Sequence, residues 1–503
     1  MNNKILSLSM GSHDSSFAIY ESNKLIIHEE LERINRIKET NDCIITHLES
    51  CGYSLDDFDV ILTFPHKNSI FYSPKYLEYK RNNPHKCIEI GHHTAHAANA
   101  FFSSDFEKSL ILTIDGGGWD VFNNAMVDST ITIWEGELNT VQLLFHTNNP
   151  NLGGLWSDCV REIFKLSSGG PPYGSQAGTV MAMTSMANGI ILPEQPYNQY
   201  ANADTQTKYN LAAGLQKITE DIIYELLKNY LSDNKYENLC VSGGVALNCV
   251  MMGKIKTWFP NLKNIFVPPV PYDAGLAIGC AQYYIHQLLK LERPKSGLYN
   301  SPYLGRIYNK ESVISAIEKN VLSYEIVNDE HVVDLLINKN IVSVFSGGSE
   351  SGRRALGNRS ILADPRHFDT KDLINQKIKH RENFRPFAPS ILRDKVTEWF
   401  INDVDSPYMS FAIPFRDEVK DKVPAVVHID GTGRLQTVTK ELNEWYYGFI
   451  TVFYNKTNVP ILLNTSFNDR EPIVETPENA INCYLNTNID CLYFSDYKIL
   501  IKK

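Results

Sequence analysis

Short apolar runs separated by polar turns open the chain and predict β-strands. Three such runs lie at residues 3–9, 14–21 and 24–29, and a helical stretch near 39–51 precedes a fourth run at 59–63. Strands and helices in this order indicate an α/β fold.

The alternation continues along the next two hundred residues or so. We expect strands at 109–115, 127–135, 238–242 and 264–268, and helices at 215–232, 246–256 and 274–290. This pattern predicts a layered sheet covered by helices. The sequence shows no internal repeat.

A segment rich in proline and glycine, RPKSGLYNSPYLG at 293–305, interrupts the periodicity and predicts a domain boundary near residue 300. We therefore divide the chain into one domain at 1–300 and another at 301–503. The second domain is also predicted to be α/β. Its expected helices lie at 309–320, 330–338, 370–379 and 440–454, and its expected strands at 341–346, 461–464 and 490–494.

Composition places the chain among ordinary globular proteins. Of its 503 residues, 43% are hydrophobic and 21% are charged, which excludes disordered and collagen-like classes. The 9 cysteines include no C-x-x-C pair, so neither a zinc ribbon nor a disulfide framework is expected. A net charge of −10 means that binding nucleic acid would need a local basic surface. With no signal peptide or membrane span in view, we expect a cytoplasmic protein.

Two histidines in the segment GHHTAHA at 91–97 have the spacing of metal ligands. His92 and His96 are four residues apart and share one face if the segment is helical. Two ligands do not make a site, and solvated histidines at a polar helix start explain the segment equally well. A third ligand would decide between these interpretations.

Two aspartates offer further ligands. Asp115 ends the strand SLILTID before three glycines, and a carboxylate at the end of a strand can reach a ligand or a phosphate. Asp273 lies where a proline-rich loop enters a helix of small residues, a position that also suits a helix cap. Histidine nitrogen and carboxylate oxygen together suit iron, manganese or zinc better than copper or magnesium.

Glycine turns and clustered cations indicate anion sites. The turn Ser242-Gly243-Gly244 follows a strand and precedes a helix, so its amides can approach an anion, although such a turn alone is a weak signal. The second domain carries a run of basic residues interleaved with glycines: Arg353, Arg354, Arg359, Arg366, Lys377, Lys379, Arg381 and Arg385. Because arginine clusters match phosphate geometry, we predict a phosphate or nucleotide site there rather than a solvated basic face.

Longer motifs run in a fixed order along nearly the whole chain. The first domain carries GSHDSS (11–16), ERINRIK (32–38), GHHTAHA (91–97), TIDGGG (113–118), SGGVALN (242–248) and DAGLAIG (273–279). The second carries RRALGNRSILADPR (353–366), IKHRENFRPFAPSIL (378–392), HIDGTGRLQTV (428–438) and LLNTSFNDREPIVETP (462–477). In these motifs the chain resembles the ATP-dependent O-carbamoyltransferases of the nodulation, cephamycin and tobramycin type.

The resemblance implies both a fold and a reaction. It implies an actin-like ATPase (ribonuclease H-like) first domain, similar to that of tRNA threonylcarbamoyl-transfer enzymes, and a YrdC-like α/β second domain. In such enzymes carbamoyl phosphate and ATP, with Mg²⁺, give carbamoyl-adenylate and pyrophosphate in the second domain. The carbamoyl group then passes to an acceptor hydroxyl in the first domain.

The resemblance also implies roles for single residues. His92, His96, Asp115 and Asp273 match the ligands of one divalent metal, expected to be iron, and His13 and Lys38 match residues at the transfer centre. The nucleotide contacts expected in the first domain are Gly116, Gly117, Ser242, Gly243, Gly244 and Asn248. The carbamoyl phosphate and ATP contacts expected in the second are Arg354, Asn358, Arg359, Lys379, Arg381, Arg385, Asn464, Ser466 and Asn468. With an unperturbed pKa of about 6.5, His13 can accept the proton of the acceptor hydroxyl.

The chain departs from the family pattern at three positions. Gly348 and Arg353 stand where relatives usually carry an arginine and a proline, and Thr179 stands where they usually carry a lysine. Nucleotide contacts in the first domain are therefore less firmly implied than metal contacts.

The resemblance leaves the acceptor open, and one local pattern bears on it. Between residues 66 and 86 basic side chains alternate with aromatic rings, which suits single-stranded or flipped nucleotides, with Lys75, Tyr76, Lys80 and Arg81 as candidate contacts. The alternative is a surface helix whose tyrosines pack against the core. The sharpest acceptor hypothesis is a hydroxymethylpyrimidine of DNA such as hydroxymethylcytosine, as in phage-type DNA modification.

Other readings of the function remain beside this one. The acceptor can instead be an antibiotic, another small natural product or a sugar hydroxyl. A tRNA threonylcarbamoyl-type transferase would share the metal and the YrdC-like chemistry, and a nucleotide sensor would keep the fold without turnover. A homodimer is one candidate assembly.

Overall fold

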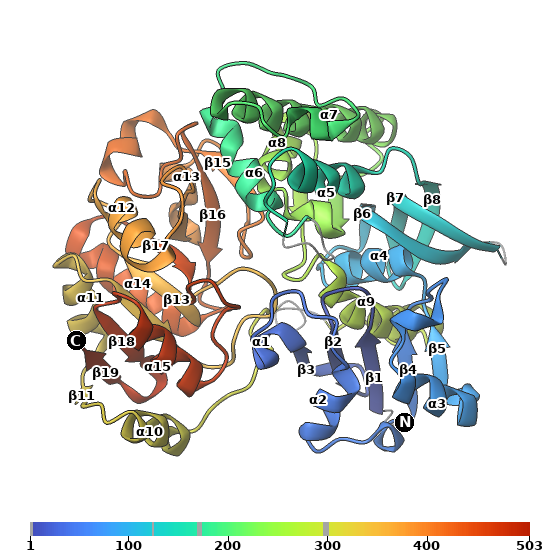
Figure 1. Cartoon of the computed structure of the whole chain (residues 1–503), viewed down its shortest axis with the longest axis horizontal. Helices are drawn as coiled ribbons and strands as arrows, with labels where there is room; N and C mark the ends of the chain where they lie inside the picture. The colour runs from blue at the N-terminus through green and yellow to red at the C-terminus, as the bar shows by residue number, and fades with distance from the viewer. Residues whose placement is uncertain (1–3, 123–124, 168–173, 295–300) are drawn as a thin grey trace. The chain divides into compact units, whose positions relative to one another are not determined.

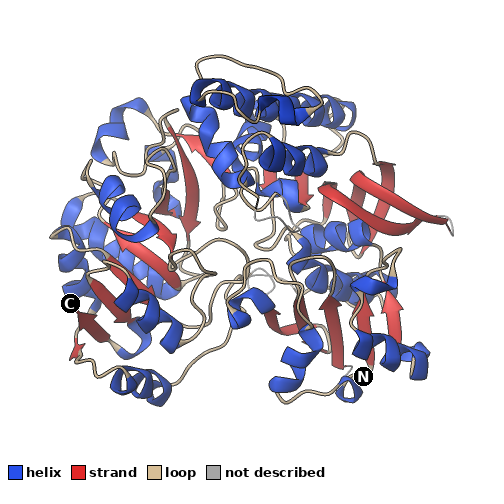
Figure 2. Ribbon diagram, viewed as in Figure 1, coloured by secondary structure: helices blue, strands red, loops and turns tan. Residues whose placement is uncertain are grey.

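The structure is a computed structural model that describes residues 4–122, 125–167, 174–294 and 301–503 (Figure 1). The chain divides into two compact units, Met1–Asn300 and Ser301–Lys503. Each unit combines β-sheets with helices, so the α/β class expected from the sequence is confirmed (Figure 2). The segment 293–305, which we predict to contain the domain boundary, lies partly outside the described residues.

The first unit contains ten strands and nine α-helices within its described residues. The strands are β1 (Lys4–Ser9), β2 (Ser16–Glu21), β3 (Lys24–Glu30), β4 (Val60–Thr63), β5 (Cys87–Glu89), β6 (Lys108–Phe122), β7 (Ala125–Glu137), β8 (Thr140–Thr147), β9 (Asn238–Ser242) and β10 (Asn264–Phe266). The helices are α1 (Leu31–Asn35), α2 (Ile44–Ser50), α3 (Pro74–Asn82), α4 (His92–Phe102), α5 (Leu152–Glu162), α6 (Ala177–Met183), α7 (Thr205–Leu231), α8 (Cys249–Trp258) and α9 (Leu276–Gln282).

These strands form two five-stranded sheets with the same strand order. The first sheet runs β3-β2-β1-β4-β5 and the second β8-β7-β6-β9-β10. In each sheet the first strand of the chain pairs antiparallel with the second and parallel with the fourth. The sequence analysis missed this internal repeat because the strand order is repeated while the side chains are not. The duplicated sheet agrees with the actin-like superfold that the resemblance implies.

Several expected elements of the first unit are confirmed and others need correction. The opening strands and the strand at 238–242 lie where the sequence predicts them. The strand at 109–115 continues as β6 to Phe122, because the three glycines after Asp115 extend the strand instead of turning it. The helix at 246–256 begins later, at Cys249, after a 3-10 turn. The predicted ranges do not include α3, α5, α6 and β8.

Helix α4 is buried along its whole length and packs against α9 and β6. Gly279 allows α9 to come close, since a Cβ atom there would lie 2.0 Å from the carbonyl oxygen of Ala95. Asp120 of β6 caps the start of α4, accepting hydrogen bonds from the amides of His93 at 2.9 Å and Thr94 at 3.0 Å. Because water cannot reach a buried helix start, this carboxylate satisfies amides that would otherwise lack a partner.

The second unit is built on one nine-stranded mixed sheet, in the order β11-β19-β18-β12-β13-β17-β14-β16-β15. Its strands are β11 (Glu325–Ile326), β12 (Val342–Phe345), β13 (Arg359–Ala363), β14 (Ala388–Leu392), β15 (Phe411–Pro414), β16 (Thr432–Val438), β17 (Ile461–Ser466), β18 (Cys491–Phe494) and β19 (Ile499–Lys502). Its α-helices are α10 (Lys310–Lys319), α11 (Asp329–Ile337), α12 (Thr370–Ile374), α13 (Val396–Trp399), α14 (Glu444–Thr457) and α15 (Pro477–Asn486).

The helices and strands predicted for this unit are present, but strands β11, β13 to β16 and β19 and helices α13 and α15 were not anticipated. All five residues of β13 and all five of β14 are buried. A strand buried on both faces shows no alternation of polar and apolar residues, so periodicity cannot reveal it. In the part of the chain that the structure describes, none of the helices has the length and apolar character needed to cross a bilayer.

Candidate functional site

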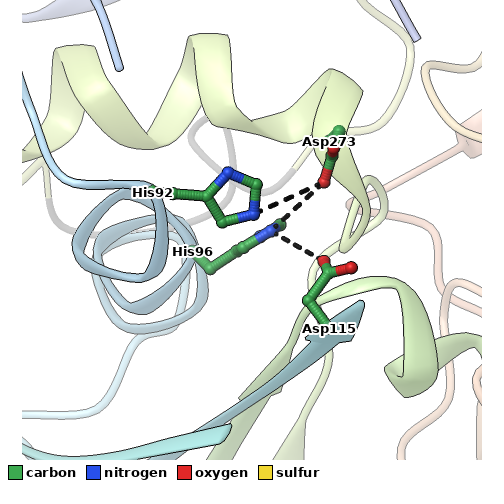
Figure 3. Close-up of side chains that lie close together, drawn as sticks. All are labelled: His92, His96, Asp115 and Asp273. Carbon is green, nitrogen blue, oxygen red and sulfur yellow. Dashed lines mark ion pairs between the residues drawn. The ribbon is translucent and has the colours of Figure 1, made fainter. Parts of the chain in front are cut away.

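Four side chains from three segments of the first unit converge on one point (Figure 3). His92 and His96 project from one face of α4, Asp115 from β6 and Asp273 from the turn before α9. The ligand atoms of the four residues all lie within 4.8 Å of one another. His96 Nε2 is 3.0 Å from Asp115 Oδ2 and 3.5 Å from Asp273 Oδ1. His92 Nε2 is 3.7 Å from Asp273 Oδ1.

Neighbouring groups fix the direction of both imidazoles. Gly118 lies against the ring of His92, where a Cβ atom would come within 2.2 Å of ring carbon Cδ2, so a larger residue would displace the ring. The Ser242 hydroxyl donates to the carbonyl oxygen of Pro271 at 3.0 Å, and its oxygen lies 3.4 Å from His96 Nδ1. That oxygen can accept the Nδ1 proton, which leaves Nε2 of His96 directed at the carboxylates.

The third histidine of the segment, His93, points elsewhere. Its Nδ1 lies 2.6 Å from the hydroxyl of Thr113 and its Nε2 lies 2.7 Å from the carbonyl oxygen of Ser129. Burial lowers the pKa of His93 to about 4. His93 is therefore a neutral histidine whose two nitrogens are both used inside the fold.

Backbone groups hold the two aspartates. Asp115 accepts hydrogen bonds from the amide of Gly116 at 2.6 Å and from the amide of Gly244 at 2.9 Å. Asp273 opens a 3-10 turn, and its carbonyl oxygen accepts a hydrogen bond from the Ser9 hydroxyl at 2.9 Å. Gly116 and Gly244, which we expected from the sequence to contact a nucleotide, thus use their amides to orient the carboxylate of Asp115.

Burial and charge together set the protonation of this cluster. Burial lowers the pKa of His96, but its pairing with Asp115 and then with Asp273 outweighs burial and raises the pKa to about 9. For Asp115, burial raises the pKa, yet His96 and the nearby amide outweigh it and hold the pKa well below its usual range. Burial lowers the pKa of His92. The ion-free cluster therefore carries an imidazolium at His96 and a carboxylate at Asp115.

The donor set fits one divalent cation. His92 Nε2 is buried and makes no hydrogen bond within the described ranges, whereas His96 Nε2 is paired with Asp115 at 3.0 Å. A buried polar atom left without a hydrogen bond costs about 1–3 kcal/mol, which coordination to a metal ion would recover. Two imidazole nitrogens and two carboxylate oxygens suit zinc, iron or manganese.

His13 lies at the edge of this cluster. Its Nε2 is 3.8 Å from Asp273 Oδ2, and its Nδ1 is 2.9 Å from Asp14 Oδ2. Burial lowers the pKa of His13, but the hydrogen bond to Asp14 and the charges of Asp14, Asp273 and Asp115 raise it to about 9. Asp14 belongs to the GSHDSS motif but was not among the predicted site residues, and its carboxylate orients the imidazole of His13.

The remaining candidates of the first unit serve the fold or stay predictions. Asn248 caps α8 by accepting a hydrogen bond from the amide of Met251 at 3.0 Å. Gly243 has φ +94°, and a Cβ atom there would lie 2.1 Å from the carbonyl oxygen of Ile114. Lys38 lies in an exposed turn after α1, and its role at the transfer centre stays a prediction, as does nucleotide binding by Gly117.

In the second unit a buried carboxylate shapes the RRALGNRS loop. One oxygen of Glu350 accepts hydrogen bonds from the amides of Leu356 at 2.7 Å and Asn358 at 2.8 Å. The Asn358 side chain donates to the carbonyl oxygen of Gly348 at 2.9 Å. Gly348 passes close to the chain at Gly305, where a Cβ atom would lie 2.5 Å from the carbonyl oxygen, so the arginine usual in relatives would not fit this backbone.

Arg359 corrects one expectation, because its side chain is fully buried. Its guanidinium donates to the carbonyl oxygens of Ser346 at 2.6 Å and Gly347 at 3.1 Å, and it lies 3.5 Å from the ring centre of Phe345. Donors committed to backbone carbonyls are not directed at a phosphate. Arg359 thus holds the loop that Glu350 also shapes.

Three other predicted contacts form one hydrogen-bonded group. Lys379 Nζ donates to the carbonyl oxygens of Ser466 at 2.6 Å and Asn468 at 2.7 Å, and to Asn468 Oδ1 at 2.8 Å. Asn464 is buried and donates to Gln436 Oε1 at 2.9 Å. Arg354 lies partly buried in the loop after Glu350.

A cluster of cations surrounds Arg381 and Arg385 and includes residues that the sequence analysis did not name. Burial and, after it, the charges of Arg385 and Arg434 together lower the pKa of Arg381 to about 9. The pKa of His428 is lowered to about 4, mainly by burial. The charges of Arg434 and Lys371 add to this lowering, whereas the charge of Asp430 opposes it. Both His428 and Arg434 belong to the HIDGTGRLQTV motif, so the sequence contained the information needed to predict them as site residues. We call Lys371, Arg381, Arg385 and Arg434 the cation cluster, beside which His428 is a neutral imidazole.

The basic and aromatic segment 66–86 corrects another expectation. Tyr76 of α3 is fully buried in the core of the first sheet, so its ring cannot stack on a base. Lys75 forms an ion pair with Glu49, and Lys80 lies 2.6 Å from Glu89. Of the four candidates, Lys75 and Arg81 are exposed. The segment contains a surface helix with a tyrosine against the core, the alternative weighed from the sequence.

Comparison with known proteins identifies the family. The family model described as "Carbamoyltransferase C-terminus" matches residues 333–502, and the family model described as "Carbamoyltransferase N-terminus" matches residues 175–282. The chain belongs to the carbamoyltransferase family. It is 30% identical to nodulation protein NolNO of Sinorhizobium fredii over 98% of this chain and 79% of that protein. It is 32% identical to nodulation protein NolO of Bradyrhizobium diazoefficiens over 82% of this chain and 78% of that protein.

Among solved structures, T. kodakarensis HypF aligns with 57% of this chain and 48% of its own, at a TM-score of 0.39 and 12% identity. The family match confirms that the chain is a transferase of carbamoyl groups, and it agrees with the ATP-dependent O-carbamoyltransferase expected from the motifs.

The raised pKa values predict how pH affects the ion-free protein. His13 and His96 have pKa values of about 9 when folded, against 6.5 ordinarily, so their contribution to stability is fully present below pH 6.5 and is lost as the pH rises towards 9. Calorimetry with a chelator should show Tm falling over this window. Because metal ligands must be unprotonated, the rise in Tm on adding a divalent cation should grow over the same window.

The double variant His92→Ala/His96→Ala is the control for this pH dependence. At pH 9 its metal-dependent rise in Tm should be smaller than that of the unsubstituted chain, because the four-residue site has lost both imidazole ligands, while the described fold around α9 is retained. A metal-dependent rise of equal size at pH 6.5 and pH 9 in the unsubstituted chain would contradict the assignment.

Proposed function

We propose that this chain is an O-carbamoyltransferase that uses carbamoyl phosphate and ATP to form carbamoyl-adenylate and then carbamoylates an acceptor hydroxyl. The observation that carries the proposal is the pairing of two chemically distinct centres in one chain of this family. The first unit holds a histidine and aspartate cluster with His13 beside it, and the second holds the cation cluster.

Activation would take place in the second unit. Transfer of the phosphoryl group of carbamoyl phosphate to water leaves carbamate, and a carbamate oxygen then attacks the α-phosphorus of ATP and releases pyrophosphate. Both substrates are anionic, and positioning with electrostatic stabilisation dominates such reactions. Arg381, Arg385 and Arg434 supply fixed positive charge whose mutual repulsion a bound polyphosphate would relieve.

Transfer would take place in the first unit. The acceptor oxygen attacks the carbamoyl carbon, the bond from that carbon to the adenylate oxygen breaks, and AMP leaves. His13 accepts the proton of the acceptor hydroxyl, and Asp14 orients it. The charges of Asp115 and Asp273 help to raise the pKa of His13, so a ligand that neutralises those carboxylates would lower this pKa and leave more of His13 unprotonated and able to accept a proton.

We propose His92, His96, Asp115 and Asp273 as the ligands of a divalent metal, with iron as the expected ion. When bound, such a cation would act as a Lewis acid towards oxygens of the adenylate. It would also neutralise the carboxylates that keep His13 and His96 protonated in the ion-free protein.

Activation can be tested without an acceptor. Release of pyrophosphate from ATP should depend on carbamoyl phosphate, and Arg381→Gln should reduce it by about 10²–10³-fold, the usual cost of losing one preorganised electrostatic contact. A coupled pyrophosphate assay measures both. Arg393→Ala is the matched control, because Arg393 pairs with Asp403 and is not part of the cation cluster. Equal pyrophosphate release without carbamoyl phosphate would refute the assignment.

The role of His13 can be separated from activation. His13→Ala should leave pyrophosphate release intact and slow acceptor carbamoylation by about 10²–10⁴-fold, because a positioned base contributes that much. Product formation is followed by mass spectrometry. His85→Ala, which replaces an exposed histidine of the same unit, should change neither step. A merely twofold effect of His13→Ala on transfer would reduce His13 to a structural role.

The acceptor is proposed only as a hydroxyl compound, and a hydroxymethylpyrimidine of DNA stays one candidate beside sugars and small natural products. The structure removes Tyr76 from any DNA groove and pairs Lys75 and Lys80 with acids. We therefore expect the triple variant Lys75→Ala/Lys80→Ala/Arg81→Ala to change acceptor KM by no more than about twofold, since exposed ion pairs contribute little.

Steady-state assays with the acceptor that mass spectrometry identifies would test this expectation. If the triple variant instead loses DNA binding in a salt-dependent way and DNA is the modified acceptor, segment 66–86 is a nucleic-acid surface after all.

A further inference from the structure

A second cluster of metal-ligand side chains lies in the first unit and shares no residue with the four-residue site. Glu29 is in β3, His47 is in α2, and Cys51 immediately follows α2. Figure 1 shows α2 beside the first sheet, and α2 packs against β2 of that sheet. His47 and Cys51 are four residues apart, so both reach the same face at the end of the helix, opposite Glu29.

The ligand atoms of this cluster meet at one point. His47 Nε2 lies 2.6 Å from Glu29 Oε2, and Cys51 Sγ lies 3.7 Å from His47 Nε2 and 4.0 Å from Glu29 Oε2. In a tetrahedral zinc site with bonds of about 2.0–2.3 Å, such ligand atoms are about 3.4–3.6 Å apart. The two distances to sulfur already approach this value. Only His47 and Glu29, drawn together by their ion pair, need to separate by less than about 1 Å.

Burial of the ligand side chains favours cation binding at this point over binding at the protein surface. The side chains of Glu29 and His47 are only 4% and 8% exposed, whereas Cys51 is half-buried. An ion could therefore enter past the sulfur and keep a water molecule as its fourth ligand. Burial of the carboxylate and the imidazole limits competition from solvent for the other positions.

A second hydrogen bond sets the direction of the His47 ring. The Ser50 hydroxyl donates to the carbonyl oxygen of His47 at 2.6 Å, and the same oxygen lies 3.3 Å from His47 Nδ1. The serine oxygen can accept the Nδ1 proton, so Nε2 is the nitrogen that faces Glu29 and Cys51. Metal-bound histidines are oriented by this kind of outer hydrogen bond.

We propose that Glu29, His47 and Cys51 bind a divalent cation of the class that accepts thiolate sulfur, with zinc as the best match. Imidazole, carboxylate and thiolate together favour zinc over calcium or magnesium, which prefer oxygen ligands. On binding, the thiol of Cys51 gives its proton to solvent, and a bond forms between sulfur and metal without any change of oxidation state. The ion would tie α2 to β3, two elements that flank the ERINRIK motif.

Cobalt is the probe that separates this site from the first. The four ligands proposed for the first site contain no sulfur, so a thiolate-to-cobalt charge-transfer band reports on the second site alone. Adding Co²⁺ to the chelator-treated full chain should produce this band within about two equivalents, because the four-residue site can also take up cobalt, and in His92→Ala/His96→Ala the band should be complete at close to one equivalent. Cys51→Ser, which changes a single atom, should abolish the band, and excess Zn²⁺ should displace it.

Matched variants make the outcome decisive. Cys87→Ser replaces another half-buried cysteine of the first unit, in β5, and should leave the band unchanged, as should His92→Ala/His96→Ala. Ser50→Ala should weaken cobalt binding by about 10–100-fold, the usual effect of losing an outer hydrogen bond to a ligand. The proposal is wrong if the chain shows no charge-transfer band or if Cys51→Ser retains it. In that case Glu29 and His47 form only a buried ion pair.

Discussion

The complete burial of α4 is the constraint on which the first unit depends. A helix without a solvated face must find internal partners for its first amides and for every polar side chain that it carries. Asp120 satisfies the amides, and His93 satisfies both of its nitrogens within the second sheet. What remains are the Nε2 atoms of His92 and His96, which face two carboxylates. The packing of the helix thus creates the centre that a cation would complete.

The duplicated sheets explain why the other groups arrive at the same place. In open α/β sheets the carboxyl ends of parallel strands form the binding edge. Asp115 is at this end of the parallel part of β6, and Ser242 ends β9 beside it. From the first sheet, the Ser9 hydroxyl at the end of β1 holds the backbone at Asp273, and His13 follows in the next turn. Each sheet therefore contributes one edge to the cluster.

Local chemistry could be predicted from the sequence, whereas packing could not. The spacing of His92 and His96 fixed their common face, and the alternation of apolar runs fixed the class of the fold. The glycines after Asp115 looked like a turn, but they are needed in a continuing strand because the His92 ring lies against Gly118. Likewise, a basic and aromatic pattern describes a nucleic-acid groove and a surface helix equally well until Tyr76 is seen to be buried. Arg359 was misassigned for the same reason, since composition does not show which arginine faces inward.

The two centres share one physical property. In each, groups of like charge lie close together, and the described fold offsets their repulsion only in part. In the first unit, the carboxylates of Asp115 and Asp273 and the unpartnered Nε2 of His92 are directed at one point. In the second, burial and the mutual repulsion of Arg381, Arg385 and Arg434 lower the pKa of Arg381, while Glu382 opposes the effect only in part. Folding alone would favour neutralising both groups of like charge, since uncompensated buried charge reduces stability. A cation bound in the first unit and an anion bound in the second would neutralise them.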